Sequence, residues 1–366
     1  MKKFILPLLL ATFFIGSAHA AVPEIHMDRW HHELRANIWG QNELDEFFAK
    51  IRQGRQDAQN GIQSEDGEYY EKSKQIEILD CDGKNVDPAD KITTLPPEIE
   101  NLPKLKRLYL QQNNLTFVPQ AIGNLEELWS LNLERNNLTS LPQAIGNLTK
   151  LETLDLGRNN FTLFPKEIGN LPKLESLHLS YNQLISIPPE IGSLPELEWL
   201  YLSNNRLISI PSEIGNLPKL RYLNLNHNNF TLFPKEIGSL TKLETLGLGG
   251  NNLTLLPQAI GNLTKLESLY LEHNNFTSLP REIGNLVRLR YLYLQQNNLP
   301  FVPPEIGNLE NLWELNLEHN NFTSLPREIE NLTKLKKLYL EHNPIKDLPR
   351  KLWKWKGKFF DESVFY

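Results

Sequence analysis

The chain has 366 residues, of which 40% are hydrophobic, and it carries a formal net charge of −6. This hydrophobic share is enough for a large core, and an acidic chain without a long basic run excludes nucleic acid as the main partner. The only cysteine, Cys81, excludes an internal disulfide, so packing must stabilise the fold.

The first 20 residues have the order of a secretory signal peptide. A basic start, MKK, precedes an apolar run over residues 4–15 and a small-residue cleavage motif, Ala18-His19-Ala20. We predict export with cleavage after Ala20, to the periplasm, the cell surface or the medium. The apolar run is too short to span a bilayer, and no later run is suited to a transmembrane helix.

Residues 21–91 are not repetitive, and we expect them to form an N-terminal helical cap followed by a degenerate first coil. Helical spacing is found in two sets of apolar residues: Ile25, Trp30, Leu34 and Ile38, and then Leu44, Phe47, Phe48 and Ile51. A polar linker is predicted near 55–74, and the first coil should contain Ile76, Ile78 and Cys81. We interpret Cys81 as a small core residue rather than a reactive thiol.

Beyond the cap, an asparagine recurs every 23 residues. The series is Asn113, Asn136, Asn159, Asn182, Asn205, Asn228, Asn251, Asn274, Asn297, Asn320 and Asn343. Each asparagine ends an LxxLxLxxN segment, whose alternation predicts a short strand. Eleven strands at one spacing, without hairpin signals between them, predict parallel coils of a solenoid.

These segments resemble leucine-rich repeats of the 23-residue class, over residues 92–349. The resemblance implies an α/β solenoid shaped as a curved horseshoe. A parallel β-sheet would line its concave face, and short helical turns and irregular coil its convex face. Internalin-type exported repeats are similar, although their usual period is 22 residues.

Each repeated position has a physical role. Inward leucines of successive coils should stack into one core, and the asparagine amide should bond to backbone groups of neighbouring turns. The proline that follows cannot donate to a strand ladder, so we expect it outside the sheet. Glycine recurs in the IGNL segment from Gly123 to Gly307, but Glu100 and Glu330 replace it at the two ends. We therefore expect this glycine to permit close approach of coils rather than a left-handed backbone.

Residues 350–366 are predicted to form a C-terminal cap. Their aromatic side chains, Trp353, Trp355, Phe359 and Phe360, are suited to cover the last coil. The same segment is rich in lysine, so contact with anionic lipid is the alternative interpretation.

The sequence contains no signature of an enzyme or of a resident cofactor. It has no GxSxG, HExxH or phosphate-binding glycine loop, and only 23 residues follow Asn343, none of them cysteine. His319 and His342 precede ladder asparagines on adjacent coils near Glu318 and Glu341, so two histidines and two carboxylates could converge on a metal ion. We interpret these as exposed polar side chains at strand exits and predict no metal.

The concave sheet is the predicted binding surface, because residues beside and between the strand leucines should face outward. Tyrosine and tryptophan recur there without serving the core, and both are favoured in recognition surfaces. The candidate ligand-binding residues are His178, Tyr181, Trp199, Tyr201, Tyr222, Asn224, His227, Gly247, Gly249, Tyr270, His273, Tyr291 and Tyr293.

The seventh repeat interrupts this surface with Thr245, Gly247, Gly249 and Gly250. We expect a shallow dent with aromatic walls at this place, suited to a protruding loop or a sugar ring. Neutral variation on a rigid sheet is the alternative.

These patterns predict an exported, monomeric, non-enzymatic protein that binds a macromolecular partner through its concave face. The expected partner is a protein, of a host or of a cell surface. Binding of envelope or host polysaccharide is the alternative, which tyrosines and polar side chains also permit. The family resemblance supports binding only by analogy, because a fold does not determine a function.

Overall fold

The computed structural model of the chain describes residues 25–27, 34–346, 348–349 and 352, and for residues 25–27 only the backbone. The predicted signal peptide (1–20) lies outside these ranges. So does the predicted C-terminal cap (350–366), apart from Leu352, which is buried at the end of the core.

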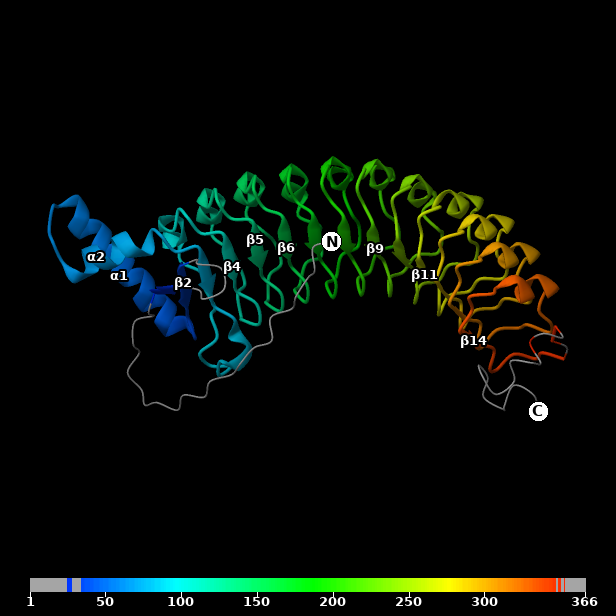
Figure 1. Cartoon of the computed structure of the whole chain (residues 1–366). Coiled ribbons are helices and arrows are strands. Elements are labelled where there is room, and N and C mark those ends of the chain that lie inside the picture. The colour runs from blue at the N-terminus through cyan, green and yellow to red at the C-terminus, as the bar shows by residue number, and fades with distance from the viewer. Residues whose placement is uncertain (1–24, 28–33, 347, 350–351, 353–366) are drawn as a thin grey trace.

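The described strands form one 14-stranded sheet in which the spatial order equals the chain order. All pairs are parallel except β1 with β2, and the solenoid curves into an arc (Figure 1). The strands are β1 Ile25–Met27, β2 Leu34–Asn37, β3 Ile78–Asp80, β4 Arg107–Tyr109, β5 Ser130–Asn132, β6 Thr153–Asp155, β7 Ser176–His178, β8 Trp199–Tyr201, β9 Tyr222–Asn224, β10 Thr245–Gly247, β11 Ser268–Tyr270, β12 Tyr291–Tyr293, β13 Glu314–Asn316 and β14 Lys337–Tyr339.

Short 3-10 helices cover the convex face and follow the outer edge of the arc (Figure 1). On this face they are η2 Pro97–Asn101, η3 Gln120–Asn124, η4 Gln143–Asn147, η5 Lys166–Asn170, η6 Pro189–Ser193, η7 Ser212–Asn216, η8 Lys235–Ser239, η9 Gln258–Asn262, η10 Arg281–Asn285, η11 Pro304–Asn308 and η12 Arg327–Asn331. A further 3-10 helix, η1 Gly83–Asn85, lies instead at the exit of β3, where the Gly83 N–H donates to the Gln111 carbonyl oxygen at 2.9 Å. A proline precedes each helix from η2 to η12, and its carbonyl accepts the first helical bond, as between Pro119 and the Ile122 N–H at 3.1 Å. The predicted solenoid, with prolines outside the sheet, is thus confirmed.

The asparagine ladder joins each coil to the one before it. In Asn205, Oδ1 accepts from the Leu184 N–H at 3.0 Å, and Nδ2 donates to the carbonyl oxygens of Leu179 at 2.9 Å and Leu202 at 3.0 Å. Equivalent bonds recur from Asn113 to Asn343. Buried backbone groups that lie outside the strand ladder are satisfied in this way, which confirms the predicted role of the asparagine.

The IGNL glycines lie where adjacent coils almost touch. A Cβ atom added to Gly123 would stand 2.5 Å from the Ala144 carbonyl oxygen, too close for any contact. These glycines do not have left-handed backbone angles, so the predicted close approach is confirmed. Left-handed angles occur instead in the residue before the ladder asparagine, for example φ 55° at Arg135 and 58° at Tyr181.

The N-terminal cap differs in part from the prediction. Helix α1, Gln41–Gln59, is the expected second helix, and Leu44, Phe47, Phe48 and Ile51 are all buried on it. The predicted polar linker is wrong, because the end of α1 and a further helix, α2, Glu65–Ser73, occupy that region. The Ser64 hydroxyl caps α2 by accepting from the Gly67 N–H at 2.9 Å.

The helix expected from Ile25 to Ile38 is also wrong, since this segment contains β1 and β2. Ala36 pairs with Leu79 of β3, so residues 34–37 form the first parallel strand of the solenoid. Backbone pairing to β3 outweighs a helical spacing that only a few apolar residues supported. Cys81 is buried in the coil of β3, as expected, and burial raises the pKa of its thiol well above the ordinary value.

Candidate functional site

The concave face presents two rows of side chains, one from the first residue of each strand and one from the last. The residue between them is a buried leucine in each strand from β4 to β14. Parallel pairing keeps both rows in register, so Ser176, Trp199 and Tyr222 are neighbours in the first row. His178, Tyr201 and Asn224 are neighbours in the second row.

A central aromatic cluster lies on β7, β8 and β9. The His178 and Tyr201 rings are 4.0 Å apart between centroids, and the Tyr201 and Tyr222 rings are 4.6 Å apart. Trp199 pairs with Tyr222 in the first row and is half-buried. Four of the predicted site residues are therefore brought together on a surface of neighbouring strands.

A second aromatic cluster lies on β11, β12 and the residue just before β13. Tyr270 and Tyr293 stack at 5.1 Å with an interplanar angle of 8°, and Tyr291 contacts Trp313 at 6.2 Å. Burial raises the pKa of the Tyr270 phenol. Three more predicted site residues are thus brought together, but in a separate group.

The glycine gap between these clusters is not the open dent that we expected. Gly247 and Gly249 are buried, because side chains of the neighbouring coils lean over them. A Cβ added to Gly247 would stand 2.7 Å from Asn226 Oδ1, and one added to Gly249 would stand 2.5 Å from Glu272 Oε1. Asn226 Oδ1 also accepts from the Gly249 N–H at 2.8 Å. Polar side chains therefore fill the gap from both sides.

Three predicted site residues, Tyr181, His227 and His273, lie at the strand exits rather than in the two rows. All three have left-handed backbone angles, with φ of 58°, 54° and 53°. Tyr181 is 48% exposed, and the Arg158 guanidinium lies 4.0 Å from its ring centroid. The remaining predicted residue, Asn224, lies in the second row, where its Oδ1 accepts from the Asn226 N–H at 3.0 Å.

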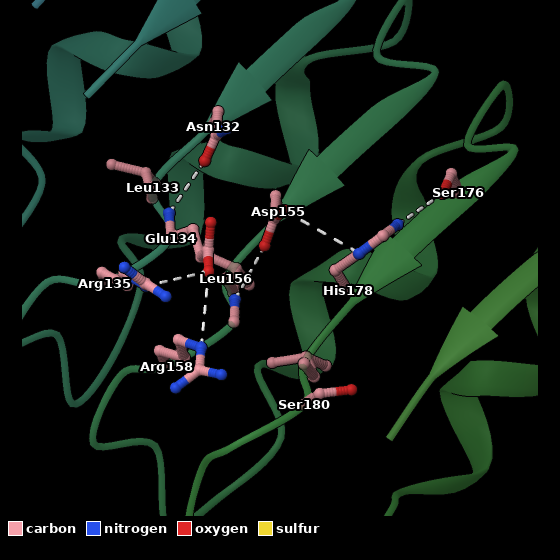
Figure 2. Close-up of polar contacts among 12 residues, drawn as sticks. Asn132, Leu133, Glu134, Arg135, Asp155, Leu156, Arg158, Ser176, His178 and Ser180 are labelled. Carbon is pink, nitrogen blue, oxygen red and sulfur yellow. Dashed lines mark hydrogen bonds and ion pairs between the residues drawn. The ribbon is translucent and has the colours of Figure 1, made fainter. Parts of the chain in front are cut away.

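A polar cluster adjoins the central aromatic cluster on its N-terminal side (Figure 2). Asp155 Oδ2 lies 3.8 Å from His178 Nδ1, and Asp155 Oδ1 accepts from the Gly157 N–H at 2.9 Å. Glu134 pairs with Arg135 at 3.3 Å and with Arg158 at 3.6 Å. The cluster thus combines two carboxylates and two guanidinium groups beside the aromatic rings.

Burial controls the protonation of Asp155 and His178. It raises the pKa of Asp155 to about 6, although the bond from the Gly157 N–H opposes this shift. It lowers the pKa of His178 to about 4. At pH 7, therefore, Asp155 carries a negative charge and His178 is neutral, so the two do not form an ion pair.

The histidines near the C-terminal end stack on one another. His319 and His342 are 4.1 Å apart between ring centroids, and burial together with Glu318 raises the pKa of Glu341. Within the described ranges, no group of three His, Cys, Asp or Glu side chains is arranged to hold a metal ion.

Two surface features were not among the predicted site residues. Asp155 was visible in the column between the strand leucines, but its burial was not. The other feature is a line of apolar side chains on the flank after the ladder asparagines, each more than half exposed: Leu163, Ile185, Ile208, Leu232 and Leu255. Their sequence signal was an apolar residue three or four positions after the asparagine, in five successive coils.

Models of known protein families match almost all of the repeats. Models of a leucine-rich-repeat region match residues 208–287 and 277–354. Models of a leucine rich repeat match residues 89–138, 130–184 and 173–230. No curated protein matches the chain.

Several solved structures are similar to the chain. A leucine-rich-repeat protein of Leptospira interrogans is 36% identical over 80% of this chain and 78% of that chain, with a TM-score of 0.67. An internalin of Listeria monocytogenes is 27% identical over 80% of this chain and 81% of that chain, with a TM-score of 0.69. The plant peptide hormone receptor RGFR1, in complex with RGF2, is 31% identical over 75% of this chain but only 45% of that chain, with a TM-score of 0.64.

The helices in the described part of the chain are all too short or too polar to cross a bilayer.

Proposed function

Because this chain belongs to the leucine-rich-repeat family, we propose that it is an exported protein whose concave sheet binds a protein partner without catalysing a reaction. The fold is typical of protein-binding scaffolds, and one similar receptor is described in complex with RGF2. The observation that carries the proposal is the central aromatic cluster of His178, Trp199, Tyr201 and Tyr222, whose rings lie outside the leucine core.

The rigidity of the face supports this role. The backbone beneath the rings is held by the asparagine ladder and by fully buried leucines such as Leu200 and Leu223. Tyrosine and tryptophan on such a surface supply large contact areas at a low cost in conformational entropy. A partner would therefore meet a preformed surface, and a substitution there would affect binding more than folding.

The proposed location rests on two observations. The start of the sequence has the order of a signal peptide, and the similar proteins include bacterial ones, from Leptospira interrogans and Listeria monocytogenes. We expect the secreted form to begin at Ala21. Fractionation of the producing cell with N-terminal mass measurement tests this, and a full-length protein confined to the cytoplasm would contradict it.

A polysaccharide is the second candidate ligand, and one observation favours it. Tyr270 and Tyr293 stack with nearly parallel planes on adjacent strands, which places two phenol side chains next to each other on the concave face. Phenol hydroxyl groups both donate and accept hydrogen bonds, so a pair of them suits the hydroxyl groups of a sugar. This candidate places the contact on the second aromatic cluster, so it can be tested separately.

The test begins with capture of partners from host-cell and envelope extracts by the exported form, and with a glycan array. The variant Tyr201→Ala/Tyr222→Ala should weaken binding of a captured protein at least tenfold. The control Phe117→Ala/Phe301→Ala removes two half-exposed rings elsewhere and should leave affinity unchanged. Equal loss in both variants would contradict protein binding through the central cluster. Glycan binding that is lost in Tyr270→Ala/Tyr293→Ala, with no protein captured from either extract, would favour the polysaccharide instead.

A further inference from the structure

A groove runs along one flank of the C-terminal coils, where the chain returns from η10, η11 and η12 to the strands that follow them. It consists of two adjoining hollows, with volumes of about 970 Å³ and about 360 Å³. Asn311 and Thr333 line both hollows, so the two form one continuous space. Volumes of this size are typical of ligand pockets. We call the combined space the flank groove.

The larger hollow is lined mainly by groups that form hydrogen bonds. The amides of Asn285, Asn308, Asn311 and Asn331 come from three successive coils, and Thr333 adds a hydroxyl group. An amide offers both donors and acceptors, and so does a hydroxyl group, which matches the hydroxyl groups of a sugar. This lining therefore favours a hydroxyl-rich ligand over an apolar one.

The smaller hollow is cationic and contains an exposed aromatic ring. Arg290, Lys334 and Lys336 line it together with Trp313, whose side chain is 48% exposed. The indole ring offers an apolar face and one N–H donor to a ligand. Its centroid lies 6.2 Å from that of the Tyr291 ring, so the flank groove adjoins the second aromatic cluster.

The cations of the flank groove are only partly compensated by the protein itself. Arg290 pairs with a glutamate of the preceding coil at 3.6 Å. Within the described residues, Arg288, Lys334 and Lys336 form no ion pair. Glu310 is the carboxylate of the lining, so three unpaired cations lie near one negative charge. A positive site of this kind on an acidic protein favours an anionic ligand.

Two earlier coils illustrate how the chain neutralises a lysine at the position of Lys334. There the lysine pairs with a glutamate 23 residues before it: Glu127 with Lys150 at 2.5 Å, and Glu196 with Lys219. Before Lys334, Asn311 replaces this glutamate, and its Oδ1 accepts a bond from Lys334 Nζ at 2.7 Å. The ammonium group is thus positioned by a neutral amide and keeps its charge, with two further N–H donors for a ligand.

The positive charge continues along the flank toward the middle of the solenoid. Lys242 and Lys265 occupy the position of Arg288 in the two preceding coils, and both are exposed. Neither forms an ion pair within the described part of the chain. Neighbouring strands are about 5 Å apart, so these cations follow one another at short intervals. An extended ligand with repeated negative charges would meet several of them in turn.

We infer that the flank groove binds an acidic polysaccharide, one that carries carboxylate or sulfate groups. Its hydroxyl groups would bond to the asparagine amides, and a sugar ring would lie against Trp313. Its anionic groups would face Arg288, Lys334 and Lys336. Single-stranded nucleic acid is disfavoured, because its bases stack on successive aromatic side chains, and Trp313 is the one aromatic residue of the described lining. The inference goes beyond the proposed function, because it assigns a second ligand to a second surface.

Isothermal titration calorimetry of the full exported chain with dextran sulfate, polygalacturonate and uncharged dextran tests the inference. At least one of the two anionic polymers should bind, with an affinity that falls as salt rises, and uncharged dextran should not. The tighter of the two shows whether sulfate or carboxylate is preferred. Binding of neither anionic polymer would overturn the inference. An oligodeoxythymidylate that binds as tightly would overturn the assignment to a sugar, because charge alone would then be sufficient.

Variants test the site itself. Lys334→Gln/Lys336→Gln should weaken binding of the tighter polymer at least tenfold, and Trp313→Ala several-fold. The control Lys150→Gln/Lys219→Gln removes the same charge from lysines that already have partners, and it should change the affinity less than twofold. Equal losses in the two lysine variants, or no effect of Trp313→Ala, would overturn the inference.

Asn311 allows a second, independent test. Asn311→Glu restores the internal partner that Lys150 and Lys219 have, so it should weaken binding at least tenfold. Asn311→Gln keeps the amide and should retain most of the affinity. Equal affinities of these two variants would show that the free charge of Lys334 is not used, contrary to the inference.

The concave face serves as the reference for both proposals. Tyr270→Ala/Tyr293→Ala should leave polymer binding within twofold, and a loss confined to this variant would overturn the inference and assign the glycan to the second aromatic cluster. Protein binding is measured separately with Tyr201→Ala/Tyr222→Ala. Failure of the proposed function and failure of the flank groove therefore give different results.

Discussion

At the scale of single residues, Asp155 is ionised at neutral pH although burial disfavours its charged form. Its pKa of about 6 in the fold lies above the ordinary value of 3.8. The folded protein therefore binds this proton more tightly than the unfolded chain does. The ionised carboxylate costs stability above about pH 6, and the cost disappears as the pH falls below about 4.

Asp155→Asn should remove this cost. Asn132, Asn224 and Asn316 occupy the same position in other coils, and each Oδ1 accepts the backbone N–H two residues ahead, as Asp155 does. We expect the variant to raise the free energy of unfolding by about 2 kcal/mol at pH 7.5 and by almost nothing at pH 4. Urea denaturation at both values checks this. Asn224→Asp is the converse variant and should destabilise only at the higher pH; a pH-independent effect would contradict the explanation.

The left-handed residue before each ladder asparagine allows a second prediction. Arg135 has φ 55°, an angle that β-branched side chains strongly resist and that asparagine tolerates. Arg135→Val should lower the free energy of unfolding by about 1–2 kcal/mol relative to Arg135→Asn. Both variants lose the pair with Glu134, so thermal and urea midpoints of the two isolate the backbone effect. Equal midpoints would show that the turn tolerates any residue.

At the scale of the coil, the glycine contacts divide the repeats into tight and loose pairs. A Cβ would stand 2.5 Å from a carbonyl oxygen at Gly123 and Gly192, but 3.1 Å at Gly146 and 3.2 Å at Gly215. Overpacking should make Gly123→Ala and Gly192→Ala less stable by about 1–3 kcal/mol. Gly146→Ala and Gly215→Ala should be within about 0.5 kcal/mol of the parent, because alanine also restricts the unfolded chain. Urea midpoints measured side by side check this order, and four equal costs would contradict it.

The elements predicted well are those that occur many times. Leucine and asparagine patterns seen in eleven coils, and a glycine pattern seen in nine, separate core positions from surface positions by repetition alone, whereas residues 25–38 occur once. Their apolar spacing fitted a helix, but Ile25–Met27 and Leu34–Asn37 are strands, and Ala36 pairs with Leu79. The pairing partner, β3, lies about 40 residues further along the chain. The local apolar pattern therefore carries no information about this contact.

For the candidate site, the sequence predicted which positions face outward but not how their side chains pack. The outward rows were correct, and the tyrosine and histidine rings do cluster on neighbouring strands. The filled glycine gap and the burial of Asp155 were missed, because they depend on where Asn226, Glu272 and His178 place their side chains. Those rotamers depend on packing against side chains of the neighbouring coils. The residue types found at one repeat position do not determine them.

At the scale of the whole molecule, stability should follow the number of coils. Residues 271–286 and 317–332 are almost identical, so removing residues 274–319 deletes two whole coils and restores the motif at the junction. We expect a folded, shorter protein with an unchanged far-ultraviolet circular dichroism signal per residue and a slightly lower urea midpoint. Small-angle scattering should record the shorter arc.

The matched control removes residues 274–308, a length that is not a multiple of the 23-residue period. It breaks the leucine and asparagine registers at the junction and should aggregate or lose cooperativity. If both deletions behaved alike, the coils would not be the units of stability.

The hairpin of β1 and β2 has a consequence for assembly. Every coil offers its neighbour the same leucines and the same strand edge, so a bare end would accept the opposite end of another molecule, and chains would join into fibres. At the N-terminal edge, β1 runs antiparallel to β2 and breaks the parallel order that an incoming coil would have to continue. We therefore expect this three-residue strand to disfavour end-to-end joining of solenoids at the N-terminal edge.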